Sequence, residues 1–296
     1  MNFDFLVASA YFTGWKLVRA LPEKFAYSTF DRLGVIALRR NGARMQRLRS
    51  NLQRVCPEKD AKAMDQLMAK AVSSYMRYWC DTFRSPDWSK EKISDTVKVT
   101  REELLTGPMR DGRGVVIALP HAGNWDHAGA YFCAMGFPLV TVAEKLKPEA
   151  LFNKFLEYRQ NMGMEVLSTD SRSMGTLMQR AREGSLIALV SDRDLSRNGV
   201  DVNFFGHPAR MPAGAALLAI RTGIPLVTAF VSYTDKGIHI EFTSVEIPEE
   251  GSDAERVALV VQRCADLFAA GIASSPQDWH MLQRIWIDGD FQERSA

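Results

Sequence analysis

The sequence has few cysteines and no long apolar run. Its four cysteines are widely spaced and form no Cys-x-x-Cys pair, which excludes a disulfide scaffold and predicts a reducing compartment. No stretch reaches the roughly 20 uninterrupted apolar residues of a spanning helix, because Asp4, Lys16 and Arg19 interrupt the best candidate. The first residues also lack a basic segment followed by a small-residue cleavage site, so we expect no signal peptide.

Motifs for covalent catalysis and for nucleotide binding are absent as well. There is no Gly-x-Ser-x-Gly elbow, no Walker A loop, and no Gly-x-Gly-x-x-Gly after an expected strand. Without a nucleophile motif, the sequence favours direct attack by a substrate hydroxyl that a base activates.

Charge is unevenly distributed, although the formal net charge is only +2. Residues 1–54 contain ten Lys or Arg and three acidic residues, which gives +7 there and −5 for the remainder. Such a segment suits nucleic acid or an anionic membrane. Its many aromatic and aliphatic residues favour lipid, so we expect peripheral attachment to the cytoplasmic face of the cell membrane and no nucleic-acid partner. An N-terminal helix packed on its own domain is the alternative.

The order of expected elements predicts an α/β fold with a mostly parallel central sheet covered by helices, preceded by an N-terminal helical membrane-facing arm. Residues 1–83 form the basic amphipathic helical arm, with a break at Pro57 and a long helix over 61–83. Residues 84–296 form the α/β core. Strands are expected at 97–100, 115–119, 139–142, 165–167, 186–190, 202–205, 226–231 and 238–247. Helices are expected near 125–135, 148–162, 173–183, 212–222 and 253–271.

The segment that follows the strand at 115–119 predicts a catalytic site. His121 lies in a loop, and Asn124 is a suitable N-cap for a helix that places Asp126 in its first turn. On one continuous helix residues five apart point about 140° away from each other, but an intervening loop lets His121 and Asp126 meet. A carboxylate on one imidazole nitrogen fixes the tautomer and leaves the other nitrogen free to accept a proton.

Three further polar clusters follow expected strands, at the sheet edge where His121 lies. Open α/β sheets bind ligands at this edge, so these loops are expected to contribute to one site. The clusters are Ala143-Glu144-Lys145 with Tyr158-Arg159, then Ser191-Asp192-Arg193-Asp194-Leu195-Ser196, then residues 204–214 with Phe204, Phe205, Arg210 and Pro212.

Metal-dependent hydrolysis is a more distant alternative. His121, Asp126 and His127 form a His-x-x-x-x-Asp-His pattern, but Gly123 replaces the middle histidine of a dinuclear pattern. The remaining histidines, which form no close pair, are His207, His239 and His280. We therefore expect no metal.

Read in order, these motifs resemble the bacterial lysophospholipid acyltransferase superfamily. The resemblance covers nearly the whole chain, in the branch of the late acyltransferases of lipid A biosynthesis and the actinobacterial phosphatidylinositol mannoside acyltransferases, and is closest to the latter. It runs through the basic N-terminal arm, His121 to Asp126 as the HX4D motif, Glu144 with Arg159, Asp192-Arg193-Asp194, Phe204-Phe205-Gly206 with Pro212-Ala213-Gly214, and Pro276 to Trp286.

The resemblance implies acyl transfer from acyl-CoA, or from acyl-carrier protein, to a hydroxyl of a glycolipid, with a mannose of phosphatidylinositol mannoside as the first candidate. A lipid A type or a lysophospholipid acceptor is the alternative. No cofactor is implied beyond acyl-CoA as co-substrate. His121 is the general base, Asp126 orients it, and a second carboxylate supports it. Asp194 is the first candidate for that carboxylate, and Asp192 and Asp201 are the others.

The resemblance also suggests which residues contact substrate. Glu144 and Arg159 would shape the donor or acceptor site, with Arg159 available to a phosphate or thioester oxygen. The loop of Asp192 and Arg193, together with Arg210, would hold the acceptor. Backbone amides near Asn124 are the expected oxyanion donors.

Overall fold

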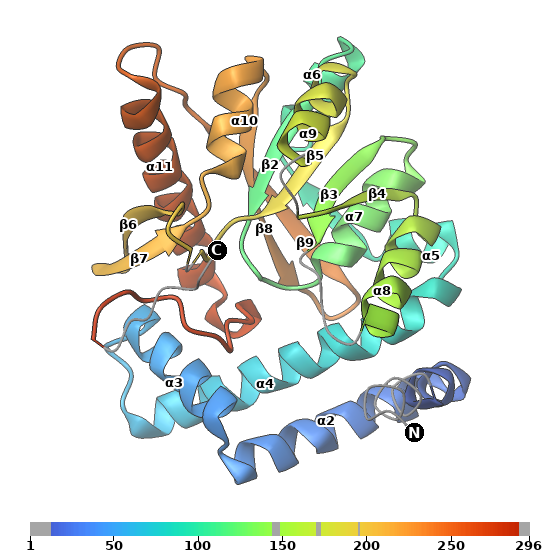
Figure 1. Cartoon of the computed structure of the whole chain (residues 1–296). Coiled ribbons are helices and arrows are strands. Elements are labelled where there is room, and N and C mark those ends of the chain that lie inside the picture. Colours follow the sequence, from blue (N-terminus) through green and yellow to red (C-terminus); the bar gives the residue numbers. More distant parts are fainter. Residues whose placement is uncertain (1–12, 144–148, 170–172, 195, 290–296) are drawn as a thin grey trace.

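A seven-stranded sheet forms the centre of the computed structural model, which describes residues 13–143, 149–169, 173–194 and 196–289 (Figure 1). The strands, in spatial order, are β1 (Val97–Thr100), β9 (Ile238–Val245), β8 (Leu226–Tyr233), β2 (Val115–Leu119), β5 (Leu186–Val190), β3 (Leu139–Ala143) and β4 (Met164–Ser168). All neighbours are parallel except β8 and β9, which form an antiparallel hairpin. The predicted α/β class with a mostly parallel sheet is confirmed.

A separate two-stranded hairpin departs from the expected pattern. It pairs β6 (Val200–Phe204) with β7 (His207–Met211), a segment that we predicted as a loop. The turn places Phe205 at φ 52° and Gly206 at φ 77°, the left-handed conformations that a two-residue hairpin turn requires. A bulky Phe rarely adopts positive φ, so the sequence carried no clear hairpin signal.

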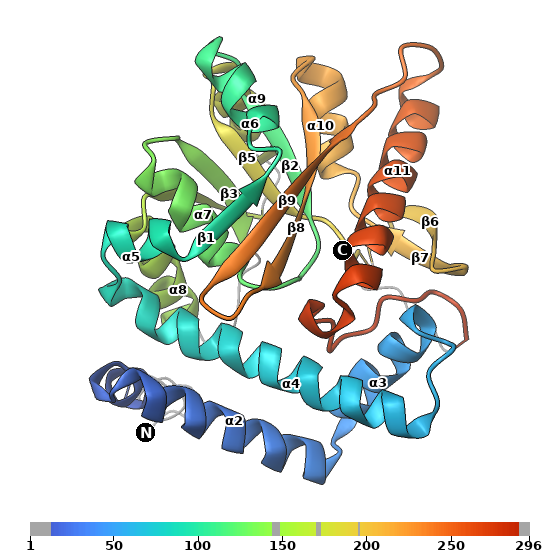
Figure 2. The same ribbon diagram turned by 180° about the vertical axis from the view of Figure 1, so that it is seen from behind.

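Helices cover both faces of the sheet (Figures 1 and 2). On one face, α7 (Trp125–Ala134) packs with two short helices that the sequence did not indicate, α5 (Lys90–Asp95) and α6 (Glu103–Arg110). On the other lie α9 (Ser173–Arg182), α10 (Gly214–Thr222) and α11 (Asp253–Ser274). Helix α8 (Glu149–Asn161) flanks β4. The two short helices escaped prediction because α5 has six residues and α6 contains Pro108.

One described helix, α11, is long and apolar enough to cross a membrane. One face of it is packed into the sheet layer, where the buried residues include Val260, Ala265 and Phe268. This pattern is typical of an amphipathic helix in a protein core.

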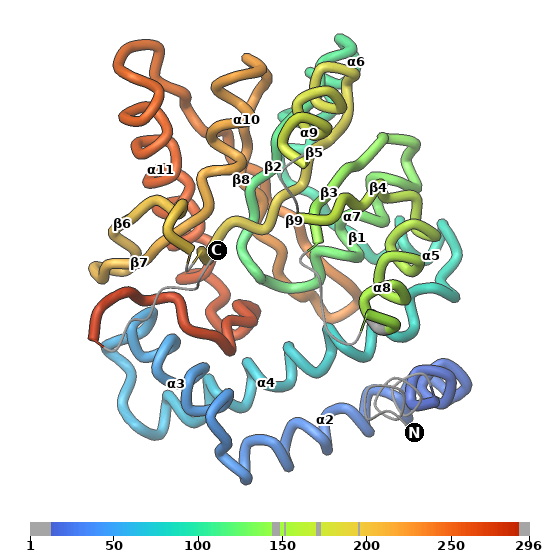
Figure 3. The backbone as a smooth tube through the Cα atoms, in the orientation of Figure 1, coloured from blue at the N-terminus to red at the C-terminus, as the bar shows by residue number. Residues whose placement is uncertain are grey.

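The N-terminal segment is helical, as predicted. Residues 13–20 are followed by α2 (Glu23–Arg40), α3 (Ala43–Val55) and α4 (Ala61–Arg84), and α2 and α4 run side by side beneath one edge of the sheet (Figure 3). The predicted break at Pro57 is present, and Asp60 caps α4 by accepting from the amide of Ala63 at 2.7 Å. Trp15 is buried against Phe83 and donates its indole N–H to the Phe83 carbonyl at 2.8 Å. The described part of the segment therefore packs on the core.

Candidate active site

The register of two neighbouring strands brings His121 and Asp192 together. In the parallel pair of β2 and β5, Leu119 lies opposite Val190. The pairing continues one step further, because the Ser191 amide donates to the Leu119 carbonyl at 2.8 Å. His121 and Asp192 each lie two residues beyond the Leu119–Val190 pair, at the carboxyl edge where α/β sheets bind ligands.

Asp192 is the carboxylate that contacts His121. Its Oδ1 is 2.6 Å from His121 Nδ1, and its Oδ2 accepts from the His121 amide at 3.0 Å. Burial alone would raise the pKa of Asp192, but the hydrogen bonds and charge of His121, with the indole N–H of Trp279, hold it below its ordinary value. Because an ionised carboxylate only accepts, Nδ1 of His121 carries a proton, so Nε2 is the nitrogen that can accept a proton when the ring is neutral. This is the tautomer that a general base needs.

His121 borders a cavity with a volume of about 1030 Å³. Its side chain is 37% exposed, whereas Asp192 is completely buried. Apolar residues dominate the wall, among them Leu119, Phe132, Leu139, Phe155, Met164 and Phe242. The charged residues of the wall are Asp126, Arg159, Arg193 and Asp194. An apolar cavity with few polar groups suits a ligand with a long hydrocarbon part.

Comparison with known proteins identifies the family. Residues 3–287 match the family model described as bacterial lipid A biosynthesis acyltransferase. The chain belongs to this acyltransferase family. It is 40% identical over 289 residues to a phosphatidylinositol mannoside acyltransferase of Mycolicibacterium smegmatis. That alignment covers 97% of this chain and 93% of the relative. It is 38% identical over 292 residues to a protein of the same name from Mycobacterium tuberculosis. That alignment covers 97% of this chain and 90% of the relative. The predicted family resemblance is therefore confirmed.

We predicted that Asp126 orients His121, but the structure gives Asp126 other partners. Asp126 accepts from Arg159 Nε at 2.8 Å and from the Tyr78 hydroxyl at 3.1 Å, and among the described residues no hydrogen bond joins it to His121. The side chain of Asp126 points from the first turn of α7 toward α8 and α4. It therefore fixes Arg159 at the cavity wall and links three helices.

The other two aspartates do not support His121 either. Asp194, our first candidate, accepts from the Ser196 amide at 2.7 Å and stays within its own loop. Asp201 is bonded to Arg210 Nε at 2.6 Å. Arg210 also donates to the Ser196 carbonyl at 3.1 Å, so it fastens the loop after β5 to the hairpin. Glu144 lies outside the described residues.

The backbone amides of residues 121–123 already donate hydrogen bonds to acceptors within the protein. The amide of His121 donates to Asp192, that of Ala122 to the Pro120 carbonyl, and that of Gly123 to the Asp278 carbonyl. They are therefore not available to a substrate oxygen. The oxyanion donors remain a prediction, now limited to the amides at the start of α7 before His127, whose own amide donates to Asn124 Oδ1.

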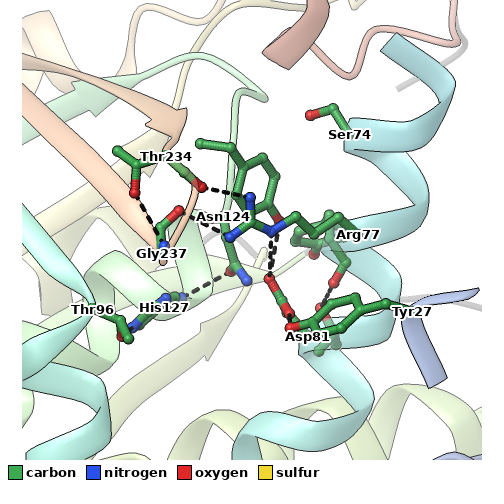
Figure 4. Close-up of polar contacts among 12 residues, drawn as sticks. Tyr27, Ser74, Arg77, Asp81, Thr96, Asn124, His127, Thr234 and Gly237 are labelled. Atoms are coloured by element: carbon green, nitrogen blue, oxygen red, sulfur yellow. Dashed lines mark hydrogen bonds and ion pairs between the residues drawn. The ribbon is translucent and has the colours of Figure 1, made fainter. Parts of the chain in front are cut away.

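A buried polar network fixes the start of α7, and the sequence did not indicate it (Figure 4). Asn124 caps the helix as predicted, since its Oδ1 accepts from the His127 amide at 2.9 Å. The Asn124 side chain also hydrogen-bonds Asp81 on α4. These two contacts orient both ends of the Asn124 amide.

Asp81 is the centre of this network. It accepts from the hydroxyls of Tyr27 and Tyr233, and Arg77 Nε lies 3.9 Å away. Burial raises the pKa of Asp81 to about 6, and the hydrogen bonds and Arg77 oppose that rise. Such contacts between distant segments leave no spacing pattern in a sequence.

The described residues contain no cluster of metal-binding side chains. Among the described residues, no group of three His, Cys, Asp or Glu side chains lies close enough to hold a metal ion. His127, which the sequence grouped with His121 and Asp126, instead contacts the Ile93 carbonyl and the Thr96 hydroxyl beneath α7.

Stability should fall as the pH drops below neutral. Burial lowers the pKa of His127 to about 4 and that of His280 to about 3, so both are neutral in the folded protein. The unfolded chain binds protons at histidine below pH ~6.5, which favours unfolding as the pH falls from ~6.5 toward 4. The raised pKa of Asp81 acts oppositely, because its buried charge costs most above pH ~6.

We expect a net loss of about 2 kcal/mol in the free energy of unfolding between pH 7.5 and 5. Urea unfolding at several pH values measures it. His127→Gln should flatten the dependence, and His239→Gln, at a partly exposed position, is the control. A dependence that is identical in wild type and His127→Gln would contradict the assignment.

Proposed function

We propose that this acyltransferase moves a fatty acyl chain from acyl-CoA to a mannose hydroxyl of a phosphatidylinositol mannoside. The geometry of His121 and Asp192 at an apolar cavity carries the chemical part of the proposal. The names of the mycobacterial relatives support the acceptor. Acyl-carrier protein as donor, and lipid A precursors or lysophospholipids as acceptors, are the alternatives that the experiment below tests.

His121 and Asp192 account for the proton transfers. The acceptor hydroxyl gives its proton to His121 Nε2 as its oxygen attacks the thioester carbonyl. Asp192, bonded to Nδ1, stabilises the imidazolium that forms. The tetrahedral intermediate then collapses, the C–S bond breaks, and the imidazolium protonates the departing thiolate of coenzyme A. A positioned base of this kind contributes about 10²- to 10⁴-fold to the rate.

The cavity suits the acyl chain of the donor. About fourteen methylenes are worth roughly 11 kcal/mol of gross transfer from water, at about 0.8 kcal/mol each. The walls that would receive them include Phe132, Met164 and Phe242. Arg159 and Arg193 on the same wall supply cations for a phosphate of the glycolipid or of coenzyme A.

Direct measurement of transfer tests the function. Purified protein is incubated with labelled palmitoyl-CoA or with labelled palmitoyl-acyl-carrier protein. Each donor is combined separately with phosphatidylinositol mannosides, a lipid A precursor or a lysophospholipid, and products are identified by mass spectrometry. We expect an acylated mannoside, and equal rates with and without EDTA. Transfer only to another acceptor, or only from acyl-carrier protein, would overturn the assigned substrates. Chelator-sensitive hydrolysis would favour a metal-dependent hydrolase.

The N-terminal helices support peripheral attachment to an anionic membrane, on the cytoplasmic face. Several large apolar side chains on these helices and on the bend between them are 37–66% exposed: Leu17, Leu21, Phe25, Leu33, Val35 and Ile36. Exposed basic residues lie among them: Lys16, Lys24, Arg32, Arg39 and Arg40. Apolar side chains that enter the interface beside cations that meet lipid phosphates are typical of an interfacial helix.

Replacing Phe25 and Ile36 with serine should weaken vesicle binding at least tenfold, because each buried large apolar side chain is worth about 1.5–3 kcal/mol. Co-sedimentation with vesicles of phosphatidylcholine and phosphatidylinositol measures the change. Leu259→Ser removes a 44% exposed apolar side chain from α11 and is the matched control. High salt should also release the protein. Equal binding by wild type and the double variant would contradict this surface.

A further inference from the structure

The C-terminal segment beginning with η2 (Pro276–Asp278) returns to the sheet edge and pairs with the loop that carries His121. Ala122 and Trp279 lie opposite each other in an isolated antiparallel bridge. The Gly123 amide donates to the Asp278 carbonyl at 2.8 Å, and the His280 amide donates to the His121 carbonyl at 2.7 Å. The backbone of the catalytic loop is therefore held by residues about 155 positions later in the chain.

Buried side chains anchor this segment to the rest of the fold. Asp278 accepts from the Ser74 hydroxyl at 2.7 Å and from the Tyr233 amide at 3.0 Å. His280 Nε2 is 2.9 Å from Ser74 Oγ. Since the single hydroxyl proton of Ser74 goes to Asp278, the Nε2 of His280 is the donor to Ser74. These hydrogen bonds fix the segment to α4 and β8.

Trp279 connects this segment to the reacting groups. Its side chain is fully buried, and its indole N–H donates to Asp192 Oδ2 at 2.9 Å. The other two hydrogen bonds to this carboxylate both come from His121. Trp279 is therefore the one donor in the described structure that fixes the orientation of Asp192 independently of His121.

We propose that Trp279 is a positioning residue, which holds the carboxylate of Asp192 so that Oδ1 faces His121 Nδ1. The inference rests on the proposed role of His121 as the base. Without the indole N–H, Oδ2 keeps only the backbone donor, so the carboxylate rotates more freely and its ionised form is less stabilised. The His121–Asp192 pair should then take up its first proton at a higher pH.

Trp279→Phe tests the proposal, because it removes the N–H and keeps an aromatic ring. Trp286→Phe is the matched control: its indole N–H donates to Asn51 Oδ1 at 2.9 Å, it is equally buried, and both rings pack on Phe204. We expect Trp279→Phe to lower kcat roughly ten- to hundredfold with KM unchanged. The acid limb of its kcat–pH profile should move to higher pH, whereas Trp286→Phe should retain the wild-type profile.

A second readout does not depend on the substrate. In ¹H NMR spectra the Nδ1 proton of His121, bonded to Asp192, should give a downfield signal that is absent in His121→Ala. It should broaden or vanish in Trp279→Phe and persist in Trp286→Phe. If Trp279→Phe does not fold by circular dichroism, 3-benzothienylalanine at position 279, which has the indole shape without the N–H, replaces it.

An unshifted pH profile together with an unchanged Nδ1 signal in a folded Trp279 variant would overturn the positioning role. Equal losses in the Trp279 and Trp286 variants would assign both residues to folding alone. Full transfer by His121→Ala would instead overturn the proposed catalytic mechanism, while the NMR signal would still decide whether Trp279 orders the pair.

Discussion

Replacing His121 with alanine should lower the rate of acyl transfer by about 10²- to 10⁴-fold, because it removes the base that we propose for the attacking hydroxyl. Asp192→Asn should cause a loss of similar order. An amide that donates to Nδ1 would move the ring proton to Nε2 and remove the lone pair that faces the cavity. The rates are measured by mass spectrometry of the product, with circular dichroism to verify folding.

The two residues should behave as one unit. The variant that lacks both His121 and Asp192 should be no slower than His121→Ala alone, because effects within a catalytic unit are not additive. Asp201→Asn, at an exposed carboxylate paired with Arg210, is the control and should retain activity. Wild-type turnover by a folded His121→Ala protein would refute the base, and multiplicative losses in the double variant would refute the coupling.

Removal of Arg159 should destabilise the protein by about 3–5 kcal/mol, because it leaves the carboxylate of Asp126 buried without its cation. The side chains of Asp126 and Arg159 are only 4% and 19% exposed. Burial alone would lower the pKa of Arg159, but the charge of Asp126 raises it, which keeps the guanidinium charged. Urea unfolding of Arg159→Met measures the loss.

The paired replacement Asp126→Leu with Arg159→Met should recover most of this stability, since it leaves no uncompensated charge. It should not recover transfer if Arg159 binds a substrate phosphate. Arg49→Met, which breaks an exposed ion pair with Asp65, is the control and should leave the unfolding free energy nearly unchanged. Equal stability of the single and the paired variants would contradict a coupled, buried pair.

Local patterns were sufficient for much of the architecture. All eight expected strands are present, and their boundaries agree within about two residues, because apolar β-branched runs were bounded by turn residues. Asn124 was predicted as the cap of α7, and His121 as the residue in the loop before it. The sequence did not indicate α5, α6 or the β6–β7 hairpin. The two helices are too short for a clear periodic pattern, and the hairpin turn lacks the usual turn residues at its first position.

The sequence predicted the candidate site only in part. The predictions that differ from the structure share one cause, which is contact between segments that are distant in the sequence. Asp126 is close to His121 in sequence, but the first turn of α7 directs it to Arg159 and Tyr78. Asp192 and Asp194 occupy one loop, and sequence spacing does not indicate which of them faces β2. The contributions of Trp279 and Asp81 depend on contacts across more than forty residues, for which a single sequence carries no signal.

The sequence by itself determined the α/β class, the helical N-terminal segment, the acyltransferase family and the placement of His121 after a buried strand. These follow from residue patterns over a few positions, where backbone preference and burial act locally. Only the tertiary structure decided which carboxylate serves His121. Strand order places β5 beside β2, and the register sets Asp192 opposite His121, whereas Asp126 stabilises α8. Strand order depends on how distant segments bury their apolar faces against one another. It is therefore set by contacts along the whole chain and not by local sequence.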